Sequence, residues 1–159
     1  MPALVQVASV DDLRALASSG RRIGPSPWRE ITQAMVDAFA ELGGDRQWIH
    51  TDPARAARES AYGGTLAHGN LTLAMLDGFR PDLLERVGGF SVALNYGWNK
   101  VRFPAPLPVG ARVRAVLEVA SVEELEGGWV QVVYKWTVER EGSDKPVCVA
   151  ENVGRLRKA

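Results

Sequence analysis

The segment from Gly69 to about Leu84 constrains the fold most, because its pattern predicts a helix that is apolar around most of its circumference. The apolar side chains of this segment are spread around the helix rather than along one stripe. A helix of this kind cannot face water and must be buried against another element. Its apolar residues include Leu71, Leu73, Ala74, Met75, Leu76 and Phe79.

From Phe90 onwards the hydrophobic period changes to two, which indicates strands. Turn signals rich in glycine, proline and aspartate separate these segments, so hairpins are expected between them. Helices followed by a run of strands favour an α+β fold with a largely antiparallel sheet. We expect this sheet to wrap around the buried helix, in a single domain over residues 1–159. The predicted strands are Ser91–Leu94, Trp98–Phe103, Ala111–Val122, Trp129–Glu139 and Val147–Leu156.

Capping signals predict three further helices ahead of the central one. Each begins after a side chain that can accept a hydrogen bond from the first turn of a helix. The second also shows apolar residues at helical spacing, and the third has proline in its first turn. These helices are expected between Ser9 and Gly20, over Gln33–Leu42 after Thr32, and from Pro53 to Ser60 after Asp52.

The composition gives no sign of a charged macromolecular partner. Nineteen basic residues balance nineteen acidic ones, so neither nucleic acid nor an anionic membrane is expected to bind. The lone Cys148 cannot form an internal disulfide, and its apolar surroundings predict a buried strand residue rather than a nucleophile. Neither a signal peptide nor a membrane-spanning run is recognisable, so we expect a cytoplasmic protein.

The acid Asp45 and both histidines of the chain, His50 and His68, lie close together in the sequence. A carboxylate and an imidazole that meet in the fold can share proton transfer near neutral pH. Gly69 follows His68 and opens the buried helix, and the first N–H groups of a helix can stabilise an oxyanion. These groups together predict acid–base chemistry beside a carbonyl group.

Each of these residues also has a purely structural interpretation. Asp45 can be a turn carboxylate, and His50 can be a half-buried histidine bonded to a backbone carbonyl. Gly69 can serve close packing of helix on sheet. Taken singly, Asp45 and His50 favour these structural interpretations, whereas their ordered combination with His68 and Gly69 favours catalysis. For His68 alone we expect a structural role ahead of a catalytic one.

Several motifs resemble the (R)-specific enoyl-CoA hydratases and MaoC-like dehydratases. They are Gly44-Asp45, His50 and Asp52-Pro53, followed by Ala67-His68-Gly69 at the start of the apolar helix. The later segment 95–110 resembles the single-domain NodN-like branch of that family, and the resemblance covers roughly residues 32–114. It implies the hotdog fold and a homodimer whose sheets join edge to edge. It also implies reversible addition of water to trans-2-enoyl-CoA, which gives the (R)-3-hydroxyacyl product.

By this resemblance, Asp45 and His50 match the catalytic pair, and Gly69 matches the backbone donor to the oxyanion. Which member of the pair is acid and which is base stays open. Asn95 and Asn99 are candidates for holding substrate or water, with turn or bulge positions as the alternative. Some family members place a supporting serine on the central helix where this chain has Asp77. We therefore assign Asp77 no catalytic role.

No metal and no separate cofactor is expected. The two histidines and one cysteine match no zinc spacing, and no phosphate-binding glycine loop is present. Coenzyme A would enter only as part of the substrate. Arg102, Arg112 and Arg114 are predicted to be solvated, with contact to a coenzyme A phosphate as a weaker alternative. The rival functions are a hotdog acyl-CoA thioesterase and a non-catalytic subunit that binds acyl thioesters. The acid–imidazole pair favours the hydratase over both.

Overall fold

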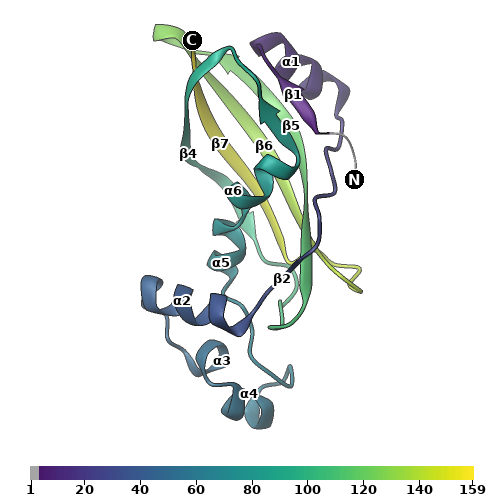
Figure 1. Cartoon of the computed structure of the whole chain (residues 1–159), viewed down its shortest axis with the longest axis vertical. Helices are drawn as coiled ribbons and strands as arrows, with labels where there is room; N and C mark the ends of the chain where they lie inside the picture. The colour runs from purple at the N-terminus through teal and green to yellow at the C-terminus, as the bar shows by residue number, and fades with distance from the viewer. Residues whose placement is uncertain (1–3) are drawn as a thin grey trace.

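A curled five-stranded antiparallel sheet forms the body of the computed structural model, which describes residues 4–159 (Figure 1). The strand order is β2-β5-β6-β7-β4, so the four long strands of the second half of the chain lie side by side. Along β6 the residues that face the helix alternate with partly exposed ones, as the predicted period of two requires. The strands are β2 Arg29–Glu30, β4 Phe90–Arg102, β5 Arg112–Glu124, β6 Trp129–Arg140 and β7 Cys148–Lys158.

The two strands predicted at Ser91–Leu94 and Trp98–Phe103 are one continuous strand, β4. Its pairing with β7 shifts register between Asn95 and Gly97 and again between Trp98 and Lys100. Such bulges bend a strand without ending it. The bends therefore account for the interruption of the sequence pattern. The other three predicted strands are confirmed, with ends that move by one or two residues.

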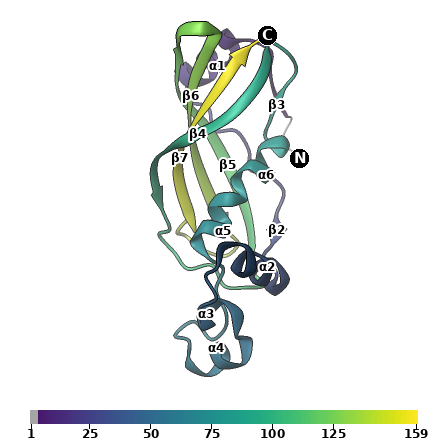
Figure 2. The same cartoon turned by 90° about the vertical axis from the view of Figure 1, so that its left-hand side faces the viewer.

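The buried helix is present but shorter and more broken than predicted. It consists of α5 Gly69–Ala74 and α6 Leu76–Phe79, followed by the 3-10 turn η1 Arg80–Asp82. Glycine within α6 and proline within η1 disfavour continuation of an α-helix. Leu84, expected at the end of the helix, instead begins β3 Leu84–Arg86, which pairs in parallel with β1 Val5–Val7. Figure 2 shows α5 and α6 running in line along one face of the sheet.

The three predicted outer helices are confirmed. They are α1 Val10–Ser19, α2 Gln33–Gly43 and α4 Pro53–Glu59, and the side chains of Ser9, Thr32 and Asp52 cap them as expected. A further short helix, α3 Trp48–Thr51, was not predicted. Helix α1 packs against β5, whereas α2, α3 and α4 gather at one end of the sheet, beside the start of α5 (Figures 1 and 2). This cluster places Asp45 and His50 at the N-terminus of the central helix.

The core lies between the central helix and the concave face of the sheet. Leu76 and Phe79 of α6 are buried there with residues of β5, β6 and β7. Cys148 is buried as predicted, and burial raises the pKa of its thiol to about 11. No helix of residues 4–159 is long and apolar enough to cross a membrane. The principal sheet residues of the core are Leu117, Val119, Val132, Trp136, Val138 and Leu156.

Candidate active site

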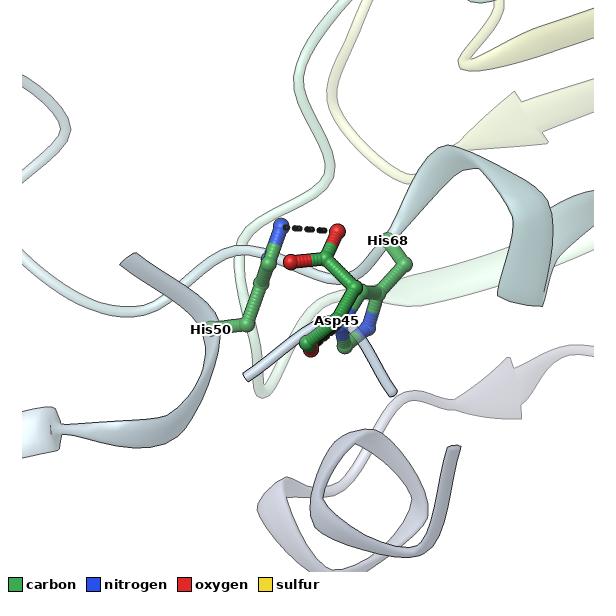
Figure 3. A group of neighbouring side chains, drawn as sticks. All are labelled: Asp45, His50 and His68. Atoms are coloured by element: carbon green, nitrogen blue, oxygen red, sulfur yellow. Dashed lines mark hydrogen bonds and ion pairs between the residues drawn. The ribbon is translucent and has the colours of Figure 1, made fainter. Parts of the chain in front are cut away.

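Asp45 and His50 face each other across a short gap (Figure 3). Asp45 follows Gly44, whose left-handed backbone ends α2, and His50 lies in α3. The Asp45 Oδ2 atom is 3.9 Å from His50 Nε2. This separation is too long for a direct hydrogen bond, and it leaves room for one water that contacts both groups. The Asp45 side chain is 60% exposed and that of His50 only 12%, so the pair opens to solvent on the acid's side.

The hydrogen bond of the other His50 nitrogen defines its chemistry. His50 Nδ1 lies 2.7 Å from the carbonyl oxygen of Leu66. A carbonyl oxygen can only accept a hydrogen bond, so Nδ1 carries the proton. In the neutral imidazole, Nε2 then holds a free lone pair directed towards the Asp45 side. His50 is thereby ready to accept a proton at the atom nearest the carboxylate.

His68 contacts both Asp45 and His50. Its buried ring stacks on His50 with ring centroids 3.8 Å apart, and the ring of Phe39 in α2 also packs on it with centroids 5.1 Å apart. His68 Nε2 lies 2.9 Å from the backbone oxygen of Asp45 and therefore donates to it. One side chain thus fixes the Asp45 backbone and the plane of the His50 ring. These contacts support the structural role that was expected for His68.

A hydrogen-bonded chain that the sequence did not reveal anchors α3. Gln33 Nε2 donates to the backbone oxygen of His50 at 2.7 Å, and Thr65 Oγ1 donates to Gln33 Oε1 at 2.6 Å. The chain connects the start of α2, the His50 backbone and the loop before α5. In the sequence Gln33 was recognisable only as the first residue of a predicted helix. Its hydrogen bond to the His50 backbone depends on how α2 and α3 pack together.

Gly69 is the first residue of α5, and the N–H groups of a first helical turn have no acceptor within their own helix. A β-carbon at this position would lie 2.8 Å from the ring of Phe103. Glycine is therefore required here for close approach of the chain segment that follows β4. A cavity of about 360 Å³ adjoins Gly69 and is lined also by Leu66, Thr72 and Phe103.

The two asparagines predicted to hold substrate do not join this pair. Asn95 Oδ1 accepts a hydrogen bond of 2.9 Å from Asn152 of β7, in a separate cluster. Asn99 is an exposed residue at the register shift between Trp98 and Lys100 of β4. Asp77 is exposed on α6, 3.6 Å from Arg80, and makes no hydrogen bond to Asp45 among the described residues. The substrate-binding roles of Asn95 and Asn99 stay predictions.

The three arginines named from the sequence lie away from Asp45 and His50. Arg112 pairs with Glu141 across the β5–β6 hairpin. Arg114 pairs with Glu139 at 2.8 Å and stacks over Trp28. Arg102 donates to the carbonyl oxygen of Val101 on its own strand. Surface pairing of this kind accounts for Arg112 and Arg114 without a ligand.

The polar atoms of Asp45, His50 and His68 come within 4.8 Å of one another, a spacing that invites comparison with a metal site. The arrangement of the two rings opposes this interpretation. The rings of His50 and His68 are stacked at an interplanar angle of 27°. Imidazole lone pairs lie in the ring plane, so stacked rings cannot both point at one ion. The donor set fits proton transfer better than metal binding.

Comparison with known proteins identifies the family. The family model for the MaoC like domain matches residues 15–140. The chain belongs to the MaoC-like dehydratase family. This membership confirms the resemblance that the motifs around Asp45, His50 and Gly69 indicated, and with it the hotdog fold. In this fold the sheet wraps around the helix as the sequence predicted.

The sequence matches individual relatives over most of their length. The chain is 52% identical to the 3-hydroxyacyl-thioester dehydratase Z of Mycobacterium tuberculosis over 92% of this chain and 95% of that protein. It is 37% identical to nodulation protein N of Rhizobium meliloti, over 89% and 87% of the two chains. Among solved structures, the R-hydratase PhaJ1 of Pseudomonas aeruginosa has the same fold. Its TM-score is 0.65 at 24% identity, over 88% of this chain and 82% of that one.

Proposed function

We propose that this MaoC-like dehydratase adds water reversibly to trans-2-enoyl-CoA thioesters and gives (R)-3-hydroxyacyl-CoA. The observation that carries the proposal is the gap of 3.9 Å between Asp45 Oδ2 and His50 Nε2. One water can accept and donate hydrogen bonds there while both groups stay in place. The relative named a 3-hydroxyacyl-thioester dehydratase supports the substrate class, because its identity of 52% extends over nearly the whole chain.

The free lone pair of His50 Nε2 makes His50 the proton acceptor of the pair. Asp45 holds one hydrogen of the water, while His50 Nε2 accepts the other as the water oxygen bonds to the β-carbon. The thioester becomes an enolate, whose oxygen accepts the Gly69 N–H. The proton on His50 then passes to the α-carbon, so both parts of one water end on the same face. The reverse sequence removes water from the 3-hydroxyacyl thioester.

The (R) configuration at the β-carbon follows from the face on which Asp45 and His50 hold the water. The solved R-hydratase PhaJ1 shares the fold, and motifs of the (R)-specific hydratases carry the resemblance here. Hydration of a trans-2-enoyl thioester from the opposite face would give the (S) product. Chiral analysis of the product therefore tests this part of the proposal.

Replacing Asp45 or His50 singly tests the proposed role of each residue. Asp45→Asn and His50→Ala should each lower the hydration turnover by a factor of roughly 10² or more, because each removes a group that contacts the reacting water. Asp144→Asn, in the exposed turn between β6 and β7, is the matched control and should leave turnover unchanged. Near-normal hydration by a folded Asp45→Asn or His50→Ala variant would remove that residue from the mechanism.

The products separate this activity from its rivals. A hydratase gives a 3-hydroxyacyl thioester, whereas a thioesterase releases free coenzyme A. A subunit that only binds acyl thioesters leaves the enoyl thioester unchanged and releases no coenzyme A. Chromatographic analysis of the thioester and free thiol in one reaction mixture distinguishes the three outcomes.

We also propose that the protein is a homodimer joined through β4. This strand forms one edge of the sheet and is 13 residues long. Val92, Leu94 and Tyr96 are exposed large hydrophobic residues along it. A long apolar edge with unpaired backbone groups favours pairing with another strand, and a second copy supplies the same strand by symmetry.

A further inference from the structure

A second cavity, distinct from the Asp45–His50 gap, lies between the far end of the central helix and the sheet. Its volume is about 530 Å³, and it is lined by residues of α6, η1 and β3 on one side and of β4, β6 and β7 on the other. Apolar side chains such as Leu84, Leu94 and Leu156 form part of its wall. The remaining wall is polar, and none of its groups has a role in the proposed mechanism.

Arg80 is the most deeply placed charge of this cavity. Its side chain is only 15% exposed. Its guanidinium lies 4.6 Å from the ring centroid of Tyr134 and 5.1 Å from that of Trp136. It also donates to Asn152 Oδ1 at 3.2 Å. Stacking on two aromatic rings holds the guanidinium plane while leaving other N–H groups for a ligand.

Tyr134 adds a phenol to the same wall. The residue is 2% exposed and lines the cavity. Burial raises the pKa of Tyr134, while the charges of Arg80 and Arg86 act in the opposite direction. Two guanidinium groups are therefore close enough to influence this phenol. A phenol hydroxyl can donate a hydrogen bond, so Tyr134 provides the cavity with a donor beside Arg80.

The acidic residues of this region lie near solvent. Asp77 is 3.6 Å from Arg80, but its side chain is 69% exposed. Glu85 is exposed on β3 and accepts a hydrogen bond from Gln6. Solvent screens such carboxylates. The inner part of the cavity therefore presents hydrogen-bond donors, and its outer part carries the negative charge.

We propose that this cavity binds a carboxylate, held by the Arg80 guanidinium and the Tyr134 hydroxyl. A planar guanidinium matches the two oxygens of a carboxylate, and the apolar wall accommodates a hydrocarbon chain attached to it. The proposed function suggests the source. Arg80 lies eleven positions after Gly69 along the interrupted helix, which corresponds to roughly 16 Å at the α-helical rise.

An acyl chain with its thioester carbonyl at Gly69 and its length along α5 and α6 would bring its far end to Arg80. This part of the inference rests on the proposed hydration. It identifies the substrate class as long enoyl thioesters that carry a terminal carboxylate. A free carboxylate in solution is the other source of the same chemistry, and it needs no link to Gly69.

Matched substrates distinguish these sources. We would measure KM for a series of trans-2-enoyl-CoA thioesters of increasing length, each with a terminal methyl and with a terminal carboxylate. The substrate interpretation predicts a KM roughly tenfold lower for the carboxylate form, as expected for a charged hydrogen bond, and only once the chain spans the gap. Arg80→Gln should abolish this preference and Tyr134→Phe should weaken it. Arg58→Gln, exposed on α4, should preserve it.

Calorimetric titration of the protein with adipate tests directly whether the cavity binds a free carboxylate. Binding that Arg80→Gln abolishes and Arg58→Gln preserves supports a carboxylate site even without a chain-length effect. Equal KM values at every length, together with no Arg80-dependent adipate binding, would overturn the proposal. If no enoyl thioester is hydrated at all, the proposed function fails, and the adipate titration alone decides for or against the cavity.

Discussion

At the scale of single residues, Gly69 tolerates little change, because a β-carbon there would meet the Phe103 ring at 2.8 Å. We expect Gly69→Ala to lower the melting temperature and to reduce hydration at least tenfold, since the first turn of α5 must move away from the substrate oxygen. Phe103→Leu should restore part of the stability of Gly69→Ala. Thermal unfolding and hydration assays of the single and double variants measure both effects. Unchanged stability and activity in Gly69→Ala would place the oxyanion elsewhere.

At this scale the sequence pointed to Asp45 and His50, which the structure brings together, but not to the contacts that support them. The spacing of Asp45 and His50, and the glycine at the start of a buried helix, carry chemistry that residue type alone reveals. The partners that set their geometry are the Leu66 carbonyl, the Gln33 amide and the Phe103 ring. These contacts join segments that are far apart in the chain. They depend on how the helices pack, which no local pattern contains.

At the scale of elements, the N-terminus of α1 provides a test of capping. Asp12 accepts hydrogen bonds from the backbone N–H groups of Ala8 and Ser9, and the former is the main reason that its pKa is lowered. A lowered folded-state pKa means that the ionised form stabilises the fold. This contribution is present at neutral pH and is lost as the pH falls through the folded pKa.

We therefore expect Asp12→Ala to lower the free energy of unfolding at neutral pH, with a difference from the wild type that shrinks as the pH falls. Asp11→Ala is the matched control, because Asp11 lies in the same helical turn but contacts only Arg14 by side chain. Urea unfolding over a series of pH values gives the comparison. A difference for Asp12→Ala that stayed constant with pH would show that its charge is not responsible.

Elements with strong local signals were predictable, and those that depend on distant partners were not. The capped helices α1, α2 and α4 have their determinants within a few residues, as do the hairpin strands β5 and β6. The short strands β1 and β3 exist only because they pair with each other, although α1 to α6 separate them along the chain. The central helix was predicted too long, because its apolar pattern continues past α6 into residues that pack as η1 and β3.

At the scale of the whole molecule, the edge strand β4 is where we propose that two copies assemble. The proposed dimer buries Val92 and its exposed apolar neighbours, and a lysine on an edge strand opposes such pairing. We expect the wild type to sediment as a dimer and Val92→Lys to shift the equilibrium towards the monomer. Ala15→Lys, exposed on α1, introduces the same charge elsewhere and should remain dimeric. A wild type that sediments as a monomer at every concentration would contradict the proposal.

Addition of water across an enoyl thioester is the activity that Asp45, His50 and Gly69 are proposed to share. Incubation of the protein with crotonyl-CoA tests it most directly, with the loss of enoyl absorbance followed and the product resolved by chiral chromatography. The proposal predicts that the absorbance falls, that the product is (R)-3-hydroxybutyryl-CoA and that no coenzyme A is released. Unchanged absorbance, an (S) product or release of free coenzyme A would contradict it.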